Sequence, residues 1–320
     1  MTSPTDTATT RVDVAHAKTH PNWGQWATRA VVLLLVAMLV HQLITNPNFE
    51  WDVVGEWLFA PSIMRALWTT LWLATVSMLI GMVLGVIFAV MKMSNNRLLR
   101  AVADAYLWFF RGTPLLVQLI FWFNLAALLP TLSIGIPFGG PDLVSWETND
   151  LITPLTAAIL GLSLNEGAYM AEVIRGGLLS VGRGQREAAK AYGMTETTAL
   201  RRVVLPQAMR SIIPPTGNQL ISMVKATAMV SVIAMHDLLY TVQAVYNRTF
   251  QTIPLLLVAV IWYLVVVSIL SFVQHHVENY YGKSDIATRG TSKKKAKGRN
   301  GDADGIDEDP AIVPQVQERT

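Results

Sequence analysis

The sequence predicts an all-α membrane protein with six transmembrane helices, and three observations support this prediction. Hydrophobic residues make up 52% of the 320 residues and charged residues only 15%, which is too apolar for an ordinary soluble domain. Uncharged runs such as residues 66–91 and 253–273 have the length of a span, for which about 20 apolar residues are needed. A polar, basic stretch at residues 185–210 carries too many charges for hydrocarbon, so it lies outside the bilayer between two spans.

The N-terminal part is expected to hold a tail and one extra span. Residues 1–28 are rich in Thr, Ser, Asp and Pro without an apolar period, which predicts a disordered cytoplasmic tail. Residues 29–45 form the extra span, whose short apolar run at 30–44 also resembles the core of a signal peptide. A signal anchor is the better interpretation, because no small-x-small cleavage pattern follows the run.

Glycine and proline mark two of the next spans. The second span carries Gly81 and Gly85, a G-x-x-x-G pair that either admits a closely packed helix or arises by chance. The third span, at about 101–129, contains Pro114, which is expected to bend it because proline removes a backbone donor. The fourth span is expected at about residues 153–174.

The distribution of Lys and Arg predicts the orientation. The fifth span is expected at about 211–235, and the sixth ends near 273, before a polar, disordered cytoplasmic tail at 276–320. A basic cluster in this tail is typical of a solvated or lipid-touching segment, so membrane lipid is an expected partner. Seven basic residues lie between Arg175 and Arg210, whereas the connector at 130–150 has none, which predicts that both termini are cytoplasmic.

The basic stretch is predicted to form two short helices on the membrane surface. Mostly good helix formers precede Gly193, which stands where a helix C-cap favours glycine. A second helix can begin at Thr195, an N-cap residue, and Pro206 is expected to interrupt it.

A motif with fixed spacing runs through these helices: Glu187-Ala188-Ala189 is followed by Gly193, then by Val203, and the motif ends with Leu205-Pro206. It resembles the EAA loop of the permease subunits of binding-protein-dependent ATP-binding-cassette importers. In that family the loop forms a coupling helix that docks into a groove on a separate ATPase subunit. The resemblance implies a coupling loop at 182–210. The residues that match the motif, and to which ATPase coupling is assigned, are Glu187, Ala188, Ala189, Gly193, Leu205 and Pro206.

Further segments resemble the polar amino acid permeases within that family. They imply a five-helix importer-type core at residues 61–275, to which one N-terminal span is added. The segment that begins at Lys225 departs from the family pattern, because Ala226 stands where the family has an acid. The matching segments are RGTPLLVQL at 111–119, GAYMAE at 167–172 and KATAMVSVI at 225–233.

Each charged residue inside a span costs about 2.5–3.5 kcal/mol on insertion and therefore needs a partner or a cavity. Such residues are candidates for a substrate pathway. Glu166 and Lys225 lie at similar depth and form either a structural ion pair or substrate contacts; Asn165 and Tyr169 complete the candidate set. The missing acid beside Lys225 favours the ion pair. A paired Glu166 leaves the pathway with little net charge, which suits a zwitterion such as glutamine, whereas a free Glu166 favours a basic amino acid. Nearer the inner end, Glu172 is expected to pair with an arginine three residues later.

No catalytic constellation is found in the sequence. Gly282-Lys283-Ser284 ends like a phosphate-binding loop, but Val277 stands where its first glycine is required. We therefore expect no enzymatic activity, no cofactor and no metal site in this chain, with ATP hydrolysis on a separate subunit.

The resemblance implies a permease that imports polar amino acids of the glutamine, glutamate, histidine and arginine class across the cytoplasmic membrane. Its implied partners are ATPase subunits, a second permease subunit in a homo- or heterodimer, an external solute-binding protein and the amino acid; no nucleic acid is expected. The alternative is a secondary amino acid transporter or channel driven by ion gradients, in which the EAA-like loop would have no purpose.

Overall fold

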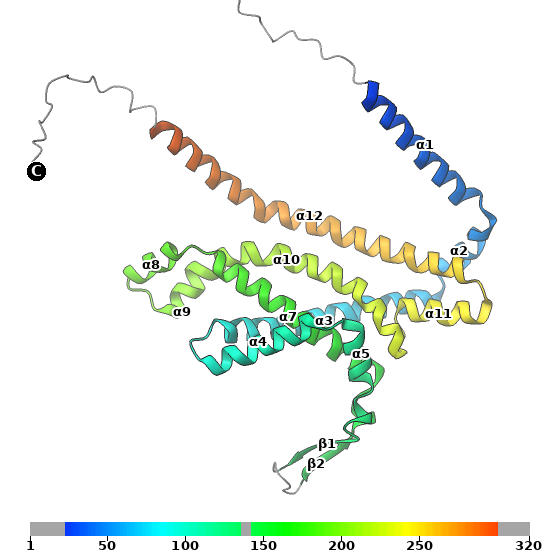
Figure 1. The fold of residues 1–320 in the computed structure, drawn as a ribbon, viewed down its shortest axis with the longest axis horizontal. Helices are drawn as coiled ribbons and strands as arrows, with labels where there is room; N and C mark the ends of the chain where they lie inside the picture. The colour runs from blue at the N-terminus through cyan, green and yellow to red at the C-terminus, as the bar shows by residue number, and fades with distance from the viewer. Residues whose placement is uncertain (1–22, 136–141, 300–320) are drawn as a thin grey trace, which may run out of the picture. The chain divides into compact units, whose positions relative to one another are not determined.

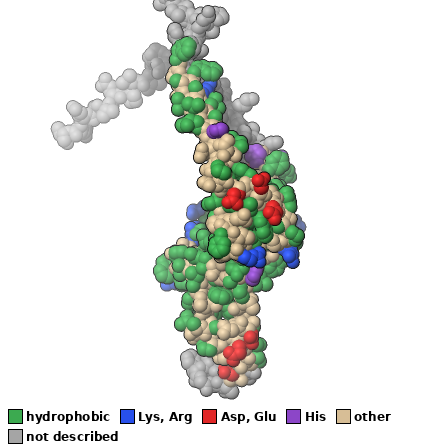
Figure 2. Space-filling model, turned by 90° about the vertical axis from the view of Figure 1, so that its right-hand side faces the viewer, with side chains coloured by type: hydrophobic (Ala, Val, Ile, Leu, Met, Phe, Trp, Pro, Cys, Tyr) green, Lys and Arg blue, Asp and Glu red, His purple; other side chains and the backbone are tan. Residues whose placement is uncertain are grey.

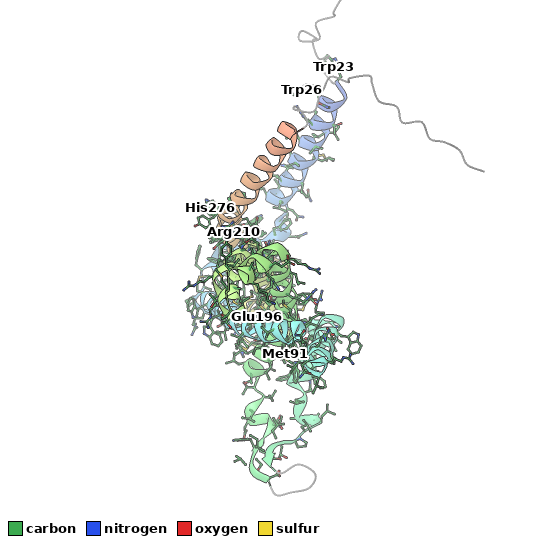
Figure 3. All side chains as sticks on the ribbon, turned by 90° about the vertical axis from the view of Figure 1, so that its left-hand side faces the viewer. Trp23, Trp26, Met91, Glu196, Arg210 and His276 are labelled. Carbon is green, nitrogen blue, oxygen red and sulfur yellow. The ribbon has the colours of Figure 1, made fainter. Side chains whose placement is uncertain are left out.

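The computed structural model describes residues 23–135 and 142–299, most of which are helical (Figure 1). The chain divides into two units, Met1–Trp51 and Asp52–Thr320. In the first unit, α1 (Trp23–Thr45) is followed by a short 3-10 turn, η2 (Pro47–Phe49). Trp23 and Trp26 lie at the start of α1 (Figure 3), so the helix begins within the stretch 1–28 that we expected to be disordered. The rest of that predicted tail lies outside the described residues.

The second unit is a bundle of long helices with one small hairpin. Its membrane-facing character is visible in the many hydrophobic side chains on the surface (Figure 2). The elements in chain order are α2 (Trp51–Leu58), α3 (Pro61–Met93), α4 (Arg97–Gly112), α5 (Leu115–Phe123), η3 (Leu125–Ala127), β1 (Thr131–Gly135), β2 (Asp142–Glu147), α6 (Thr148–Leu151), α7 (Pro154–Ser180), α8 (Arg183–Ala191), α9 (Glu196–Ala199), η4 (Leu200–Val204), α10 (Leu205–Ala226), η5 (Thr227–Ile233), α11 (Leu238–Thr249) and α12 (Thr252–Arg299).

Helices α3 and α7 pack closely at the two glycines of the G-x-x-x-G pair. A Cβ atom added to Gly81 would lie 2.9 Å from Cβ of Glu166, and one added to Gly85 would lie 2.6 Å from Cβ of Met170. Both distances are too short for real carbon atoms, so only glycine permits this separation of the helices. The packing interpretation of the glycine pair is therefore confirmed over chance spacing.

The third predicted span is broken rather than bent. Helix α4 ends before Pro114, which is the N-cap residue of α5. Nε2 of the buried Gln118 donates to the carbonyl oxygens of Phe110 and Thr113, both at 3.1 Å. The side chain thus satisfies carbonyl groups that the break leaves without a helical donor.

The fifth and sixth spans also differ from the prediction. Pro206 does not interrupt the chain: the π-helix η4 leads directly into α10, where Pro206 occupies the first turn and needs no helical acceptor. Helix α12 continues to Arg299 through part of the predicted disordered tail. Near the start of this extension, Nε2 of Gln274 lies 2.7 Å from the Pro214 carbonyl oxygen and 2.9 Å from Oε1 of Glu278.

A pair of strands and a helix were missing from the prediction. The connector at 130–150 contains the antiparallel pair β1 and β2, in which Thr131 faces Glu147, so the described chain is not entirely α-helical. Between the fifth and sixth spans lies α11, which is capped by Asp237: its Oδ1 accepts from the backbone N–H of Tyr240 at 2.8 Å.

By length and composition, three helices in the described ranges are long and apolar enough to cross a membrane: α1, α3 and the first part of α12. A fourth is added if the bent pair ending in α11 is counted as one span. The broken α4–α5 pair and the charged α7 do not pass this test, and they account for the difference from the six predicted spans.

Candidate substrate pathway and coupling loop

A small cavity lies between α5, α7 and α10, with a volume of about 240 Å³. Three of the four predicted pathway residues border it, and they all come from α7, where their spacing places them on neighbouring faces. Lys225 does not border it. The lining side chains are Leu115, Leu162, Asn165, Glu166, Tyr169, Gln219, Ser222, Met223 and Ala226.

Glu166 is the charged group of this cavity. Its side chain is buried, and Oε1 has no hydrogen-bond partner among the described residues. The side chain of Gln219, on the facing helix α10, interacts with the carboxyl group. Gly81 lies directly behind Glu166, so the glycine of α3 provides the space in which this acid sits. A buried carboxyl group with one unused oxygen is available to a cationic ligand.

The expected ion pair between Glu166 and Lys225 is wrong. Lys225 is exposed in the last turn of α10, and no ion pair to it is found in the described parts of the chain. At about 100° per residue, Lys225 points to a different side of α10 from Gln219, which is the residue that faces Glu166. Similar depth in the membrane was therefore not enough to bring the two charges together.

Asn165 and Tyr169 are held by the broken span. Nδ2 of Asn165 donates to the carbonyl oxygen of Phe110 at 2.9 Å and lies 3.3 Å from Oε1 of Gln118. The ring of Tyr169 lies under Arg111, whose Cζ is 5.6 Å from the ring centre. Gln118 was missed by the sequence analysis, although a glutamine in an otherwise apolar run signals a polar role.

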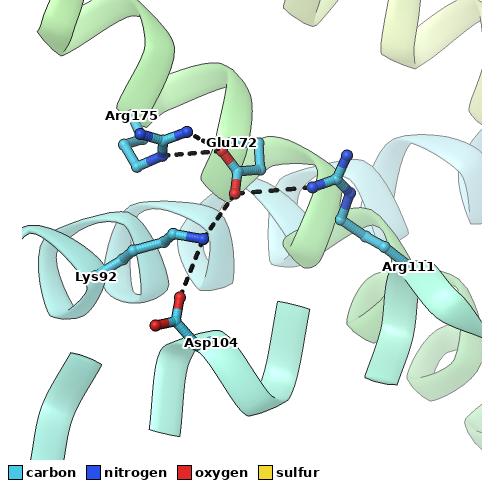
Figure 4. Close-up of polar contacts among 5 residues, drawn as sticks. All are labelled: Lys92, Asp104, Arg111, Glu172 and Arg175. Atoms are coloured by element: carbon cyan, nitrogen blue, oxygen red, sulfur yellow. Dashed lines mark hydrogen bonds and ion pairs between the residues drawn. The ribbon is translucent and has the colours of Figure 1, made fainter. Parts of the chain in front are cut away.

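A charged cluster centred on Glu172 lies farther along α7 (Figure 4). Nη2 of Arg175 lies 2.7 Å from Oε2 of Glu172, so the predicted local pair is confirmed. Nζ of Lys92 lies 2.9 Å from Oε1 of Glu172 and 3.1 Å from Oδ1 of Asp104, and Nη1 of Arg111 lies 3.7 Å from Oε1 of Glu172. The cluster joins α3, α4 and α7. Its members on other helices could not be predicted from local spacing.

The candidate coupling loop folds as two short helices, α8 and α9. Gly193 has a φ of 73°, the left-handed conformation predicted for a C-cap glycine, and Oγ1 of Thr195 accepts from the backbone N–H of Thr198 at 3.3 Å. Glu187 and Ala188 are exposed on α8, whereas Ala189 is buried against the rest of the loop. Leu205 and Pro206 are exposed in the first turn of α10. The exposed part of α8 is therefore free to contact another chain.

Comparison with known proteins identifies the family. Residues 81–281 match the model of the family described as the binding-protein-dependent transport system inner membrane component. The chain belongs to this family. The family predicted from the EAA motif is therefore confirmed, and this inner membrane component is a transport protein rather than an enzyme.

Relatives of this inner membrane component are named for amino acid transport. The arginine transport system permease protein ArgU of Corynebacterium glutamicum is 43% identical over 271 residues, which cover 84% of this chain and 83% of the relative. The glutamine transport system permease protein GlnP of Escherichia coli is 30% identical over 72% of this chain and 97% of its own length. A crystal structure of an amino acid ABC transporter with histidines matches with a TM-score of 0.59 and 34% identity, covering 69% of this chain and 95% of that chain.

Proposed function

We propose that this chain is the membrane subunit of an ATP-driven importer of basic amino acids, with arginine as the first candidate substrate. The observation that carries the proposal is Glu166, a buried carboxyl group that borders the cavity and has an oxygen without a partner. The relative ArgU, named for arginine transport, points to the same substrate class.

The chemistry of the cavity fits a cationic side chain. Removing a carboxylate from water is costly unless a cation or hydrogen-bond donors replace the water, and the described residues supply no cation to Glu166. An arginine or lysine ligand would supply it, and the guanidinium group has donors for Glu166 and for the amide oxygen of Gln219. Tyr169 and Asn165 supply further contacts at the same cavity.

The proposal includes partners and orientation. We assign six spans to the chain by adding α4–α5 and α7 to the four identified by length; the packing of α7 against α3 and of α5 against α7 supports this assignment. The exposed face of α8, with Glu187, is assigned to an ATPase subunit, and the hairpin β1–β2 to the outer side, where a solute-binding protein delivers substrate. A second permease subunit completes the pathway, and both termini are cytoplasmic.

Exchanging Glu166 for Gln in the reconstituted complex tests the proposal. Uptake of radiolabelled arginine and glutamine is compared, with Lys225→Gln as a control that removes a charge away from the cavity. We expect Glu166→Gln to lower arginine uptake at least tenfold relative to glutamine uptake, and Lys225→Gln to leave the ratio unchanged. Unchanged rates for both amino acids in Glu166→Gln would remove Glu166 from the pathway.

A further inference from the structure

A larger cavity, with a volume of about 540 Å³, lies between α3, α7, α10 and α12, away from the site of Glu166. Its walls are almost entirely aliphatic, with Val86, Ile213 and Leu270 among the residues that line it. The two polar side chains in the wall are already engaged: Thr216 donates to the carbonyl oxygen of Ile212 at 2.8 Å, and Gln274 donates as described above. A polar amino acid would find no binding groups here, so the cavity fits an apolar ligand.

A second cavity of about 540 Å³ borders the first and has a different chemical character. It lies where α3 and α7 end against α8 and α9, and two residues, Leu178 and Leu200, line both cavities. In Figure 3, Glu196 at the start of α9 marks this region. The apolar cavity therefore adjoins, at Leu178 and Leu200, a second cavity whose lining includes charged side chains.

Two basic side chains give the second cavity its charge. Arg186 and Lys190 lie one turn apart on α8, so they share a face of that helix, whereas Glu187 points about 100° away. Nη2 of Arg186 donates to the carbonyl oxygen of Leu178 at 2.8 Å, which holds the guanidinium beside Leu178; its other N–H groups have no partner in the parts of the chain that the structure describes. Glu196 is the one carboxylate in the lining, so the lining carries a net positive charge.

We propose that the two cavities together bind one anionic phospholipid. An acyl chain occupies the apolar cavity, and the phosphate group lies against Arg186 and Lys190. This occupant follows from the adjacency of the two cavities and from their charge: the ligand must be apolar at one end, anionic at the other, and available at the end of membrane-spanning helices. The proposal assigns a second role to α8, because its basic face would bind lipid while the face carrying Glu187 stays free.

The test uses the complete transporter complex in nanodiscs that contain equal amounts of phosphatidylcholine and phosphatidylglycerol. After transfer to detergent, native mass spectrometry counts the lipids retained per permease chain. We expect selective retention of phosphatidylglycerol, and several-fold less of it in the double variant Arg186→Gln, Lys190→Gln. Arg183→Gln is the matched control, because Arg183 also lies on α8 but does not line either cavity.

A second pair of variants tests the apolar end without altering the loop. Val86→Trp fills the cavity, whereas Val83→Trp adds the same bulk at another exposed valine of α3 that does not line it. We expect only Val86→Trp to lower phosphatidylglycerol retention. Equal retention of the two lipids by the unmodified complex, or equal retention by Val86→Trp and Val83→Trp, would overturn the proposal. If the loop variants prevent assembly with the ATPase, the valine pair alone decides.

Discussion

Lys92 and Glu172 lie 80 positions apart in the sequence, yet Nζ of Lys92 is 2.9 Å from Oε1 of Glu172. Both side chains are largely shielded, with exposed fractions of 25% and 21%. Arg175 and Arg111 contact the same carboxylate, so a single acid balances cations from three helices. Loss of this carboxylate would leave Lys92 with Asp104 alone and would remove the carboxylate that Arg175 and Arg111 contact in this cluster.

Replacing Glu172 with Gln is therefore expected to destabilise the permease by about 1–2 kcal/mol, because Lys92 is partly buried while solvent screens the more exposed Arg175 and Arg111. Asp104→Asn is the control, because Asp104 is 54% exposed and contacts only Lys92 within the cluster. Its expected effect is at most about 1 kcal/mol. Thermal unfolding of the purified variants in detergent measures both effects. Equal midpoints for Glu172→Gln and the unmodified protein would show that the cluster does not stabilise the bundle.

The left-handed backbone at Gly193 leads to a prediction about coupling. No atom of the described residues lies within 4 Å of a Cβ added there, so the strain that a side chain would cause within the permease arises from the φ of 73°. A β-branched residue is strained in this conformation by about 1–2 kcal/mol or more, whereas Asn adopts it readily. We expect Gly193→Val to abolish transport and substrate-stimulated ATPase activity in the reconstituted complex, while Gly193→Asn retains both.

Gly184 provides the control for this experiment. It lies in α8, also has open space around an added Cβ, and has no positive φ. Gly184→Ala should leave stimulation intact, because alanine favours a helix. Normal stimulation in an inserted Gly193→Val protein would refute the role assigned to this turn.

The sequence predicted the parts of the fold that depend on local patterns. The turn at Gly193 and the cap at Thr195 follow from the backbone preferences of those residues. At Pro114 the sequence predicted where the span is disturbed, but it predicted a bend where the structure has a break. Pairing of Glu166 with Lys225 failed because depth in a membrane says nothing about which side of a helix a residue faces. The contacts of Gln118 with Asn165, and of Lys92 with Glu172, depend on helix packing that no local pattern encodes.

Because α3 and α7 pack closely, we expect substitution of Gly85 to lower the stability of the permease. A Cβ there would lie 2.6 Å from Cβ of Met170 and 3.0 Å from its backbone carbon, so the helices must move apart. We expect Gly85→Ala to lower the unfolding free energy by about 1–3 kcal/mol, as is usual for overpacked sites. Gly176→Ala is the control, because Gly176 lies on α7 with no atom within 4 Å of an added Cβ. Similar unfolding midpoints for the two variants would contradict the packing described here.

The proposed orientation leads to a prediction about chemical labelling. The natural chain contains no cysteine, so a single introduced thiol reports its own position without background. Ser145 lies exposed in β2, in a connector without basic residues, whereas Ser292 adjoins the basic cluster that the positive-inside rule places in the cytoplasm. In intact cells, a membrane-impermeant maleimide should label Ser145→Cys and leave Ser292→Cys unlabelled until the membrane is permeabilised. Labelling of Ser292→Cys in intact cells would reverse the orientation, and α8 would then lie on the side of the membrane that holds no ATP.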